Sequence, residues 1–237
     1  MKSNKKENKM RFSGVLYIFL SSFLRLGTSQ QQENPRSVII GDSMYKSGMP
    51  FFSGYPSPLA KWLETWAGHS IENNALVGAS LESGWVKSIR QQFESLSYSK
   101  PLTTIVMDGG GNDVMSHKSD CLKFNEACQQ MLQNCQQIAQ SIISDARTKG
   151  VQNILYLGFY GLEGLEDSAK RGNELISEVC REKEKCYFVN PLYNATMGKG
   201  LKVPEMLGSD KLHPNEEGYE LLAEMLWNVT LKEGIQL

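Results

Sequence analysis

Histidine is scarce in this chain, which has three His among 237 residues and no CxxC pair. Zinc sites need three or four closely placed Cys, His or carboxylate ligands. His69 and His117 have no partner carboxylate at a useful spacing, so we interpret both as surface or loop residues. The sequence therefore predicts no bound metal ion.

The apolar run near the start, 12–24, is too short to cross a bilayer, which takes about 20 residues. It follows a lysine-rich stretch and precedes the small residues Gly27 and Ser29. This pattern is typical of a signal peptide that is cleaved on export, with an uncleaved membrane anchor as the alternative. We expect 1–29 to be the signal peptide, 30–237 to be the functional domain, and the protein to be secreted or extracytoplasmic.

The chain also has no excess of basic residues once the expected signal peptide is removed. The segment 1–29 contains six basic residues and one acidic residue, so 19 basic and 25 acidic residues remain, a net charge near −6. Nucleic acids and anionic membranes bind basic surfaces. The charge therefore argues against both as partners.

The chain has only five cysteines, and their number and context fit an oxidising compartment. Cys180 and Cys186 flank a predicted helix-to-strand step and are expected to form a disulfide. If Cys128 and Cys135 share a helix, they lie about 10 Å apart along it, too far to bond. Cys121–Cys128 is then the expected second pair, which leaves Cys135 as a free thiol.

Short apolar runs rich in β-branched and aromatic residues alternate with stretches of helical spacing. The expected strands lie within 37–43, 69–78, 103–110, 153–161 and 186–191. The expected helices lie within 56–68, 85–96, 128–150, 165–185 and 215–231. This alternation predicts an α/β domain with a doubly wound parallel sheet, whose ligand sites gather at the carboxyl ends of the strands.

Polar residues follow several of these strands. Ser43 ends VIIGDS, Gly78 ends NNALVG, and Asn112 follows three consecutive glycines in DGGGNDVM. Near the C-terminus, Asp210 and His213 stand three residues apart, a spacing at which the carboxylate can orient the imidazole. The set contains a nucleophile, a base with its acid, and donors for an oxyanion.

The four blocks GDS at 41–43, Gly78 within NNALVG, GGND at 110–113 and DKLH at 210–213 resemble the signature blocks of the SGNH (GDSL-type) hydrolase superfamily. They occur in the family's order and span most of the chain after residue 30. The resemblance implies a flavodoxin-like three-layer α/β/α sandwich around a parallel five-stranded sheet. It also implies an esterase, lipase, thioesterase or carbohydrate deacetylase that needs no cofactor and acts on small-molecule, lipid or glycan esters.

Carried over block by block, the resemblance implies that Ser43 is the nucleophile, His213 the base and Asp210 its orienting partner. The oxyanion would be held by the backbone N–H groups of Ser43 and Gly78 and by the Asn112 side chain. In this mechanism the serine forms an acyl-enzyme, which water then hydrolyses.

Met44 stands where the name-giving motif has leucine, a swap that conserves volume and polarity. Together with Phe51 and Phe52, it is a candidate wall for an acyl group, although packing against the sheet also explains these apolar residues. Asn194 and Asn228 each begin a sequon for N-glycosylation, which matters only in a host that glycosylates.

Two other functions use the same scaffold: acyl transfer to a sugar or alcohol in place of water, and non-catalytic binding of carbohydrate or lipid. At the level of single residues, Ser43 alone would also serve as a helix cap, and Asp113 fits a structural cap after the glycines. Asp210 fits a cap for the last helix as well as a catalytic acid.

Overall fold

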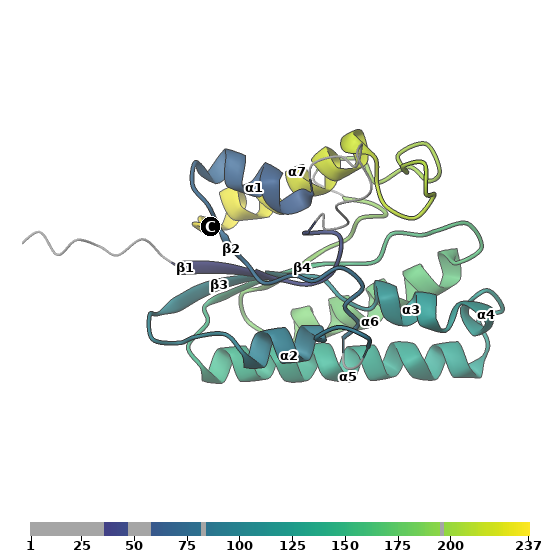
Figure 1. Cartoon of the computed structure of the whole chain (residues 1–237), viewed down its shortest axis with the longest axis horizontal. Helices are drawn as coiled ribbons and strands as arrows, with labels where there is room; N and C mark the ends of the chain where they lie inside the picture. The colour runs from purple at the N-terminus through teal and green to yellow at the C-terminus, as the bar shows by residue number, and fades with distance from the viewer. Residues whose placement is uncertain (1–35, 47–57, 82–83, 195–196) are drawn as a thin grey trace, which may run out of the picture. The chain divides into compact units, whose positions relative to one another are not determined.

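Five short apolar segments of the chain form one parallel sheet (Figure 1). The structure is a computed structural model that describes residues 36–46, 58–81, 84–194 and 197–237. The strands are β1 (Arg36–Ile40), β2 (Glu72–Asn73), β3 (Leu102–Met107), β4 (Asn153–Leu157) and β5 (Cys186–Val189). Their order in the sheet is β2-β1-β3-β4-β5, and every neighbouring pair is parallel. The predicted parallel five-stranded sheet is confirmed.

The strands are apolar on both faces because helices cover both sides of the sheet. In β1, Val38 and Ile40 belong to one hydrophobic core, whereas Ile39 between them belongs to the other. In β4, Tyr156 and Leu155 divide in the same way. This period of two places successive side chains in opposite layers.

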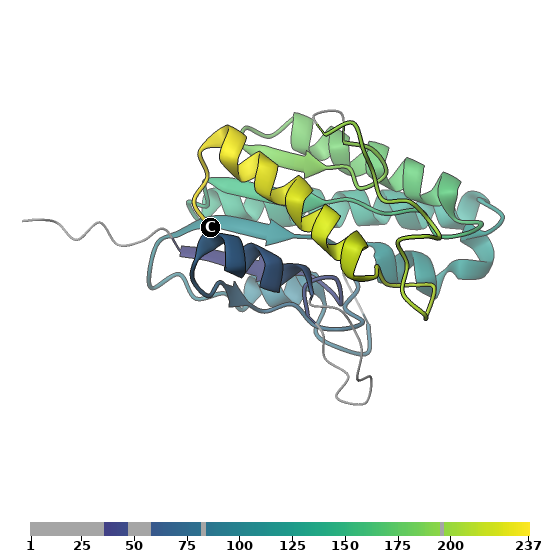
Figure 2. The ribbon, with the colours of Figure 1, turned by 90° about the horizontal axis from the view of Figure 1, so that it is seen from above.

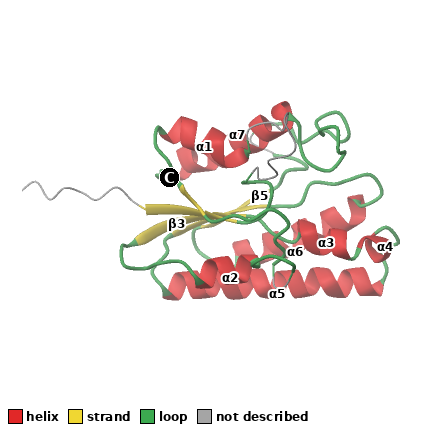
Figure 3. Cartoon of the chain, viewed as in Figure 1, coloured by secondary structure: helices red, strands yellow, loops and turns green. Residues whose placement is uncertain are grey.

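Seven helices are described outside the sheet. They are α1 (Leu59–Ala67), α2 (Ile89–Glu94), α3 (Gly111–Ser116), α4 (Lys118–Cys121), α5 (Glu126–Thr148), α6 (Glu166–Arg181) and α7 (Glu216–Glu233). Helices α1 and α7 cover one face of the sheet, and α2, α5 and α6 cover the other (Figures 1 and 3). Seen from above, α1 and α7 run side by side over the strands (Figure 2). The predicted three-layer sandwich is confirmed.

Side-chain caps fix where the long helices begin. Asn125 Oδ1 accepts the Cys128 N–H at the start of α5, and Asn215 Oδ1 accepts the Gly218 N–H at the start of α7. Such caps satisfy backbone donors that have no partner within the helix. The cap of the last helix is therefore Asn215, and the alternative that Asp210 caps it is wrong.

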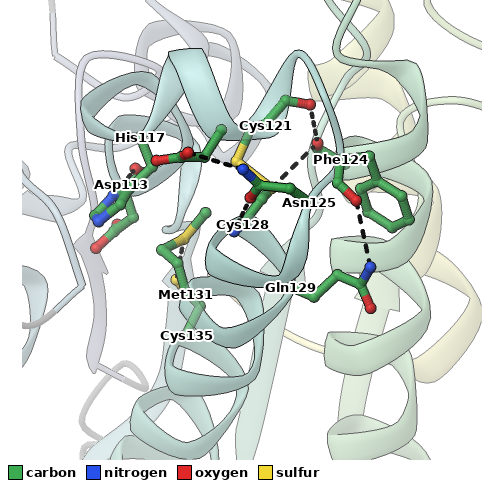
Figure 4. The surroundings of a disulfide bond; sticks show 11 residues. Asp113, His117, Cys121, Phe124, Asn125, Cys128, Gln129, Met131 and Cys135 are labelled. Carbon is green, nitrogen blue, oxygen red and sulfur yellow. Dashed lines mark hydrogen bonds between the residues drawn. A yellow bond between two sulfur atoms is a disulfide. The ribbon is translucent and has the colours of Figure 1, made fainter.

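The structure pairs the cysteines that the spacing predicted. Cys121 and Cys128 join α4 to the first turn of α5, with sulfur atoms 2.19 Å apart (Figure 4). The sulfur atoms of Cys180 and Cys186 are 2.15 Å apart. Cys135 is free and buried on α5, where burial raises the pKa of its thiol.

The expected signal peptide, 1–29, and the aromatic residues Phe51 and Phe52 lie outside the described residues. Among the residues that are described, none of the helices combines the length and the apolar character needed to cross a membrane.

Candidate active site

The residues that the sequence singled out gather at the carboxyl edge of the sheet. Ser43 lies in the turn after β1, Asn112 lies at the start of α3 after β3, and His213 lies in the segment between β5 and α7. This edge is where ligands bind in doubly wound sheets. Ser43, Asn112 and His213 all line one pocket there.

A chain of two short hydrogen bonds joins Ser43, His213 and Asp210. The Ser43 Oγ lies 2.7 Å from His213 Nε2, and His213 Nδ1 lies 2.6 Å from Asp210 Oδ2. An ionised carboxylate can only accept, so Nδ1 donates its proton to Asp210. In the neutral imidazole Nε2 is then an acceptor for the Ser43 hydroxyl, which is the arrangement of a base next to a nucleophile.

The segment that contains His213 is held from within and from β4. Asp210 Oδ1 accepts the backbone N–H groups of Leu212 and His213, both at 3.0 Å. The Tyr160 hydroxyl, three residues beyond the end of β4, donates to the Leu212 carbonyl at 2.8 Å. Because Leu212 directly precedes His213, this bond holds the backbone next to the imidazole.

The turn that contains Ser43 is packed so tightly that only glycine fits before it. Gly41 has φ +152°, and a Cβ there would lie 2.1 Å from Asp108 Oδ1. The buried Gln92 side chain forms hydrogen bonds with both the N–H and the carbonyl of Gly41. Asp42 Oδ1 accepts the Met44 N–H across the turn. These contacts leave the Ser43 side chain directed at the pocket.

The Asn112 amide is anchored between the first and second signature blocks. Its Nδ2 lies 3.0 Å from Asp42 Oδ2 and 3.0 Å from the Ala79 carbonyl oxygen. Both amide hydrogens therefore have protein acceptors. A further acceptor placed in the pocket would have to share one of them in a three-centre bond.

Gly78 does not belong to the described residues that line the pocket of Ser43 and His213. It lines a second, more exposed hollow with Ser80 and Trp85, and Asn112 borders both hollows. Gly78 has φ +79°, a left-handed conformation that favours glycine. Asp113 Oδ2 accepts the Leu81 N–H and so ties α3 to the segment after Gly78. This contact differs from the helix cap predicted for Asp113, because the cap residue of α3 is Gly110 and α3 has no side-chain cap.

Two buried carboxyl groups lie directly beneath the nucleophile. Asp108 Oδ1 accepts the Asp42 N–H at 3.0 Å, and both side chains are buried. Burial, and then the charge of Asp42, hold the pKa of Asp108 well above its usual range. Burial also raises the pKa of Asp42, but the Met44 N–H lowers it and, to a smaller extent, so does the Asn112 amide. We assign the proton to Asp108 and the charge to Asp42.

This assignment predicts the pH dependence of the Asp108→Asn variant. Burial and the charge of Asp42 raise the folded-state pKa of Asp108 above its unfolded-state value of about 4. The free energy of unfolding of wild type therefore falls as pH rises from about 4 toward the folded-state pKa. Asparagine resembles the protonated acid and does not titrate. We expect the free energy of unfolding of Asp108→Asn, measured by urea denaturation, to increase relative to that of wild type between about pH 5 and pH 8.

The control is Asn134→Ala on the exposed side of α5, which removes no ionisable group and should keep a constant difference from wild type over the same range. A constant difference for Asp108→Asn as well would contradict the assignment of the proton.

Sequence reasoning missed several residues of this site. Met44 lines the pocket as expected, but Asp108, Phe159 and Tyr160 line it too. The signal available for the last two was the aromatic pair in LGFYG, directly after a predicted strand. Within the described parts of the chain, no group of three or more His, Cys, Asp or Glu side chains is placed to hold a metal ion.

Known structures share this architecture at low sequence identity. A catalytic mutant of an acetylxylan esterase from Geobacillus stearothermophilus is 16% identical with a TM-score of 0.59, covering 82% of this chain and 93% of that one. A lipase/acylhydrolase from Enterococcus faecalis is 15% identical with a TM-score of 0.58, covering 84% and 96%. A lipase from a goat rumen metagenome is 16% identical with a TM-score of 0.57, covering 82% and 97%. At these identities the likeness shows the fold.

No curated protein matches the chain. A family model does match it, over residues 39–221, which is most of the chain and includes every block discussed above. That model describes the GDSL-like lipase/acylhydrolase family. The chain belongs to the GDSL-like lipase/acylhydrolase family of the SGNH hydrolases.

Proposed function

We propose that this protein is an exported serine esterase that cleaves carboxylic esters through an acyl-enzyme on Ser43. The observation that carries the proposal is the continuous hydrogen-bonded chain from Ser43 Oγ to His213 to Asp210, at 2.7 and 2.6 Å. Ester hydrolysis is the chemistry of the family to which the chain belongs. The two disulfides support export, because such bonds persist in oxidising compartments.

In the first half-reaction Ser43 Oγ attacks the ester carbonyl carbon while His213 Nε2 takes the hydroxyl proton. Asp210 stabilises the imidazolium that forms. The tetrahedral intermediate collapses when the carbon–oxygen bond to the alcohol breaks, and the alcohol leaves with the proton from His213. In the second half-reaction His213 removes a proton from water, which attacks the acyl-enzyme and releases the carboxylic acid and Ser43.

The negative charge on the carbonyl oxygen needs donors during both steps. We assign this role to the backbone N–H groups of Ser43 and Gly78 and to the Asn112 amide. The amide borders both the pocket of Ser43 and the hollow of Gly78, which supports a position between them. One amide hydrogen is shared between its protein acceptor and the oxyanion, so the donor is already oriented before the substrate arrives.

Replacement of Asn112 by alanine tests this assignment. The variant keeps Ser43 and His213 but loses one oxyanion donor, so kcat should fall by about 100- to 1000-fold with little change in KM. The control is Asn134→Ala on the exposed side of α5, which should retain wild-type kinetics. Wild-type kcat in Asn112→Ala would show that the amide only braces Asp42 and Ala79.

Acyl transfer to an alcohol or sugar is the second candidate, because it shares the first half-reaction. The test is hydrolysis of p-nitrophenyl esters with and without added alcohols and sugars, with all products quantified. A hydrolase releases one carboxylic acid for each nitrophenol under all conditions. A transferase instead yields new esters and releases nitrophenol faster when acceptor is added. Release of no nitrophenol would favour the third candidate, a binding domain without catalysis.

A further inference from the structure

The pocket that contains Ser43 and His213 continues into an apolar chamber between α3 and the start of α6. Its walls are the side chains of Val114, Met115, Phe159, Leu162, Leu165 and Ala169. Four of them are at least nine-tenths buried: Val114, Phe159, Leu165 and Ala169. We call these six residues the apolar chamber. It lies beside the reacting atoms and none of its walls takes part in the proposed chemistry.

The wall formed by Phe159 is fixed rather than adaptable. Its ring lies against two glycines, because a Cβ on Gly110 or Gly172 would come within 2.4 or 2.9 Å of ring atoms. The buried Asn173 side chain clamps the Phe159 backbone, accepting its N–H at 2.7 Å and donating to its carbonyl at 2.8 Å. The chamber is therefore preformed, which lowers the cost of ordering a ligand in it.

The chemistry of the walls selects an apolar occupant. A polar group in the chamber would lose its hydrogen bonds to water and meet carbon atoms and a thioether. A hydrocarbon chain gains by leaving water and contacting the same atoms.

Of the two halves of an ester, the acyl group suits a chamber with buried walls. It stays bonded to Ser43 through both half-reactions, whereas the alcohol has to leave after the first. The hollow on the other side of Asn112, at Gly78, Ser80 and the fully exposed Trp85, offers the alcohol a route to solvent.

We propose that the apolar chamber binds the acyl chain, so that the substrates are esters of fatty acids longer than acetate. This inference rests on the proposed esterase function and deepens it. Phe159 and Ala169 are then the residues that limit the acyl chain. Ala169 has the smallest side chain of the chamber, and leucine at this position places three more carbon atoms in the space that the acyl chain would occupy.

The test compares kcat/KM for p-nitrophenyl esters from acetate to decanoate in wild type and Ala169→Leu. Wild type should prefer hexanoate or octanoate to acetate by about 10-fold or more. Ala169→Leu should lower kcat/KM for octanoate by about 10- to 100-fold and leave acetate within about threefold of wild type. The matched control is Ala67→Leu on α1, which adds the same atoms on the opposite face of the sheet and should change neither.

A second variant, Leu162→Trp at the half-buried rim, gives the same readout if Ala169→Leu does not fold. A second substrate series, acetate esters of alcohols from ethanol to octanol, separates the two halves of the ester. Sensitivity of either variant to alcohol length rather than acyl length would overturn the assignment. So would a wild-type preference for acetate that both variants leave unchanged.

If the wild-type protein hydrolyses none of the esters and does not react with a fluorophosphonate, the proposed function is overturned, and with it the assignment of the apolar chamber to the acyl chain. Wild type that hydrolyses esters but shows no acyl-length effect in the variants would overturn the chamber alone.

Discussion

Replacement of Ser43 by alanine is expected to lower kcat for ester hydrolysis by about 10⁴-fold or more. The hydroxyl forms the only covalent bond to the substrate in the proposed mechanism, and alanine has no atom to replace it. Removal of the 2.7 Å bond to His213 at a half-buried position should shift Tm by less than about 4 °C. Activity and stability are measured on the same preparation, so that loss of fold is not mistaken for loss of chemistry.

The control is Ser99→Ala, in the exposed segment that leads into β3 at the amino end of the sheet. It should retain wild-type activity. A Ser43→Ala variant within tenfold of wild-type kcat would exclude Ser43 as the nucleophile.

The second large effect is expected at His213, and its size should depend on whether Ser43 is present. His213→Ala removes the base for both half-reactions, so kcat should again fall by about 10⁴-fold or more. In the Ser43→Ala background the same change should cost little, because a nucleophile and its base act as one unit and their losses are not additive. The measurement is a double-mutant cycle on kcat, with His69→Ala as the surface control.

If the loss of kcat in the double variant equals the product of the losses in the two single variants, a shared mechanism is contradicted. Such a result would indicate that Ser43 and His213 act in separate steps despite their 2.7 Å separation.

Much of the fold follows from local patterns in the sequence. Each strand of the sheet overlaps one of the predicted apolar runs, with β1 and β3 each beginning one residue earlier than predicted. The five predicted helices correspond to α1, α2, α5, α6 and α7. These elements are set by hydrophobic period, which is a local property. The pairing of Cys121 with Cys128 could be predicted for a related reason. Cys128 and Cys135 share a helix, and their separation along it is too large for a disulfide.

Helices α3 and α4 were not predicted, because the glycines that precede and begin α3 indicate a loop when only local propensity is considered. The structure supplies the reason for Gly110. It has φ +100°, and the Phe159 ring occupies the space that a side chain would need. That contact joins residues 49 positions apart in the sequence, so no local pattern reveals it.

The sequence led to the candidate triad but not to its surroundings. Ser43, Asp210 and His213 were found because their types and order match a family pattern, and the structure places them within hydrogen-bonding distance. The buried Asp108 and the clamp of Asn173 on Phe159 depend on tertiary packing alone. The sequence predicted the wall for the acyl group within residues 44–55. The residues of the apolar chamber belong instead to α3, α6 and the segment between β4 and α6.

The most direct test of the proposed mechanism is peptide mapping by mass spectrometry after reaction with a fluorophosphonate. The reagent bonds to a serine only where a neighbouring base activates the hydroxyl. We predict one adduct per chain, on the peptide that contains Ser43, and no adduct in His213→Ala over the same time. An adduct on another residue, or equal labelling of His213→Ala, would contradict the assignment of Ser43 as a nucleophile activated by His213.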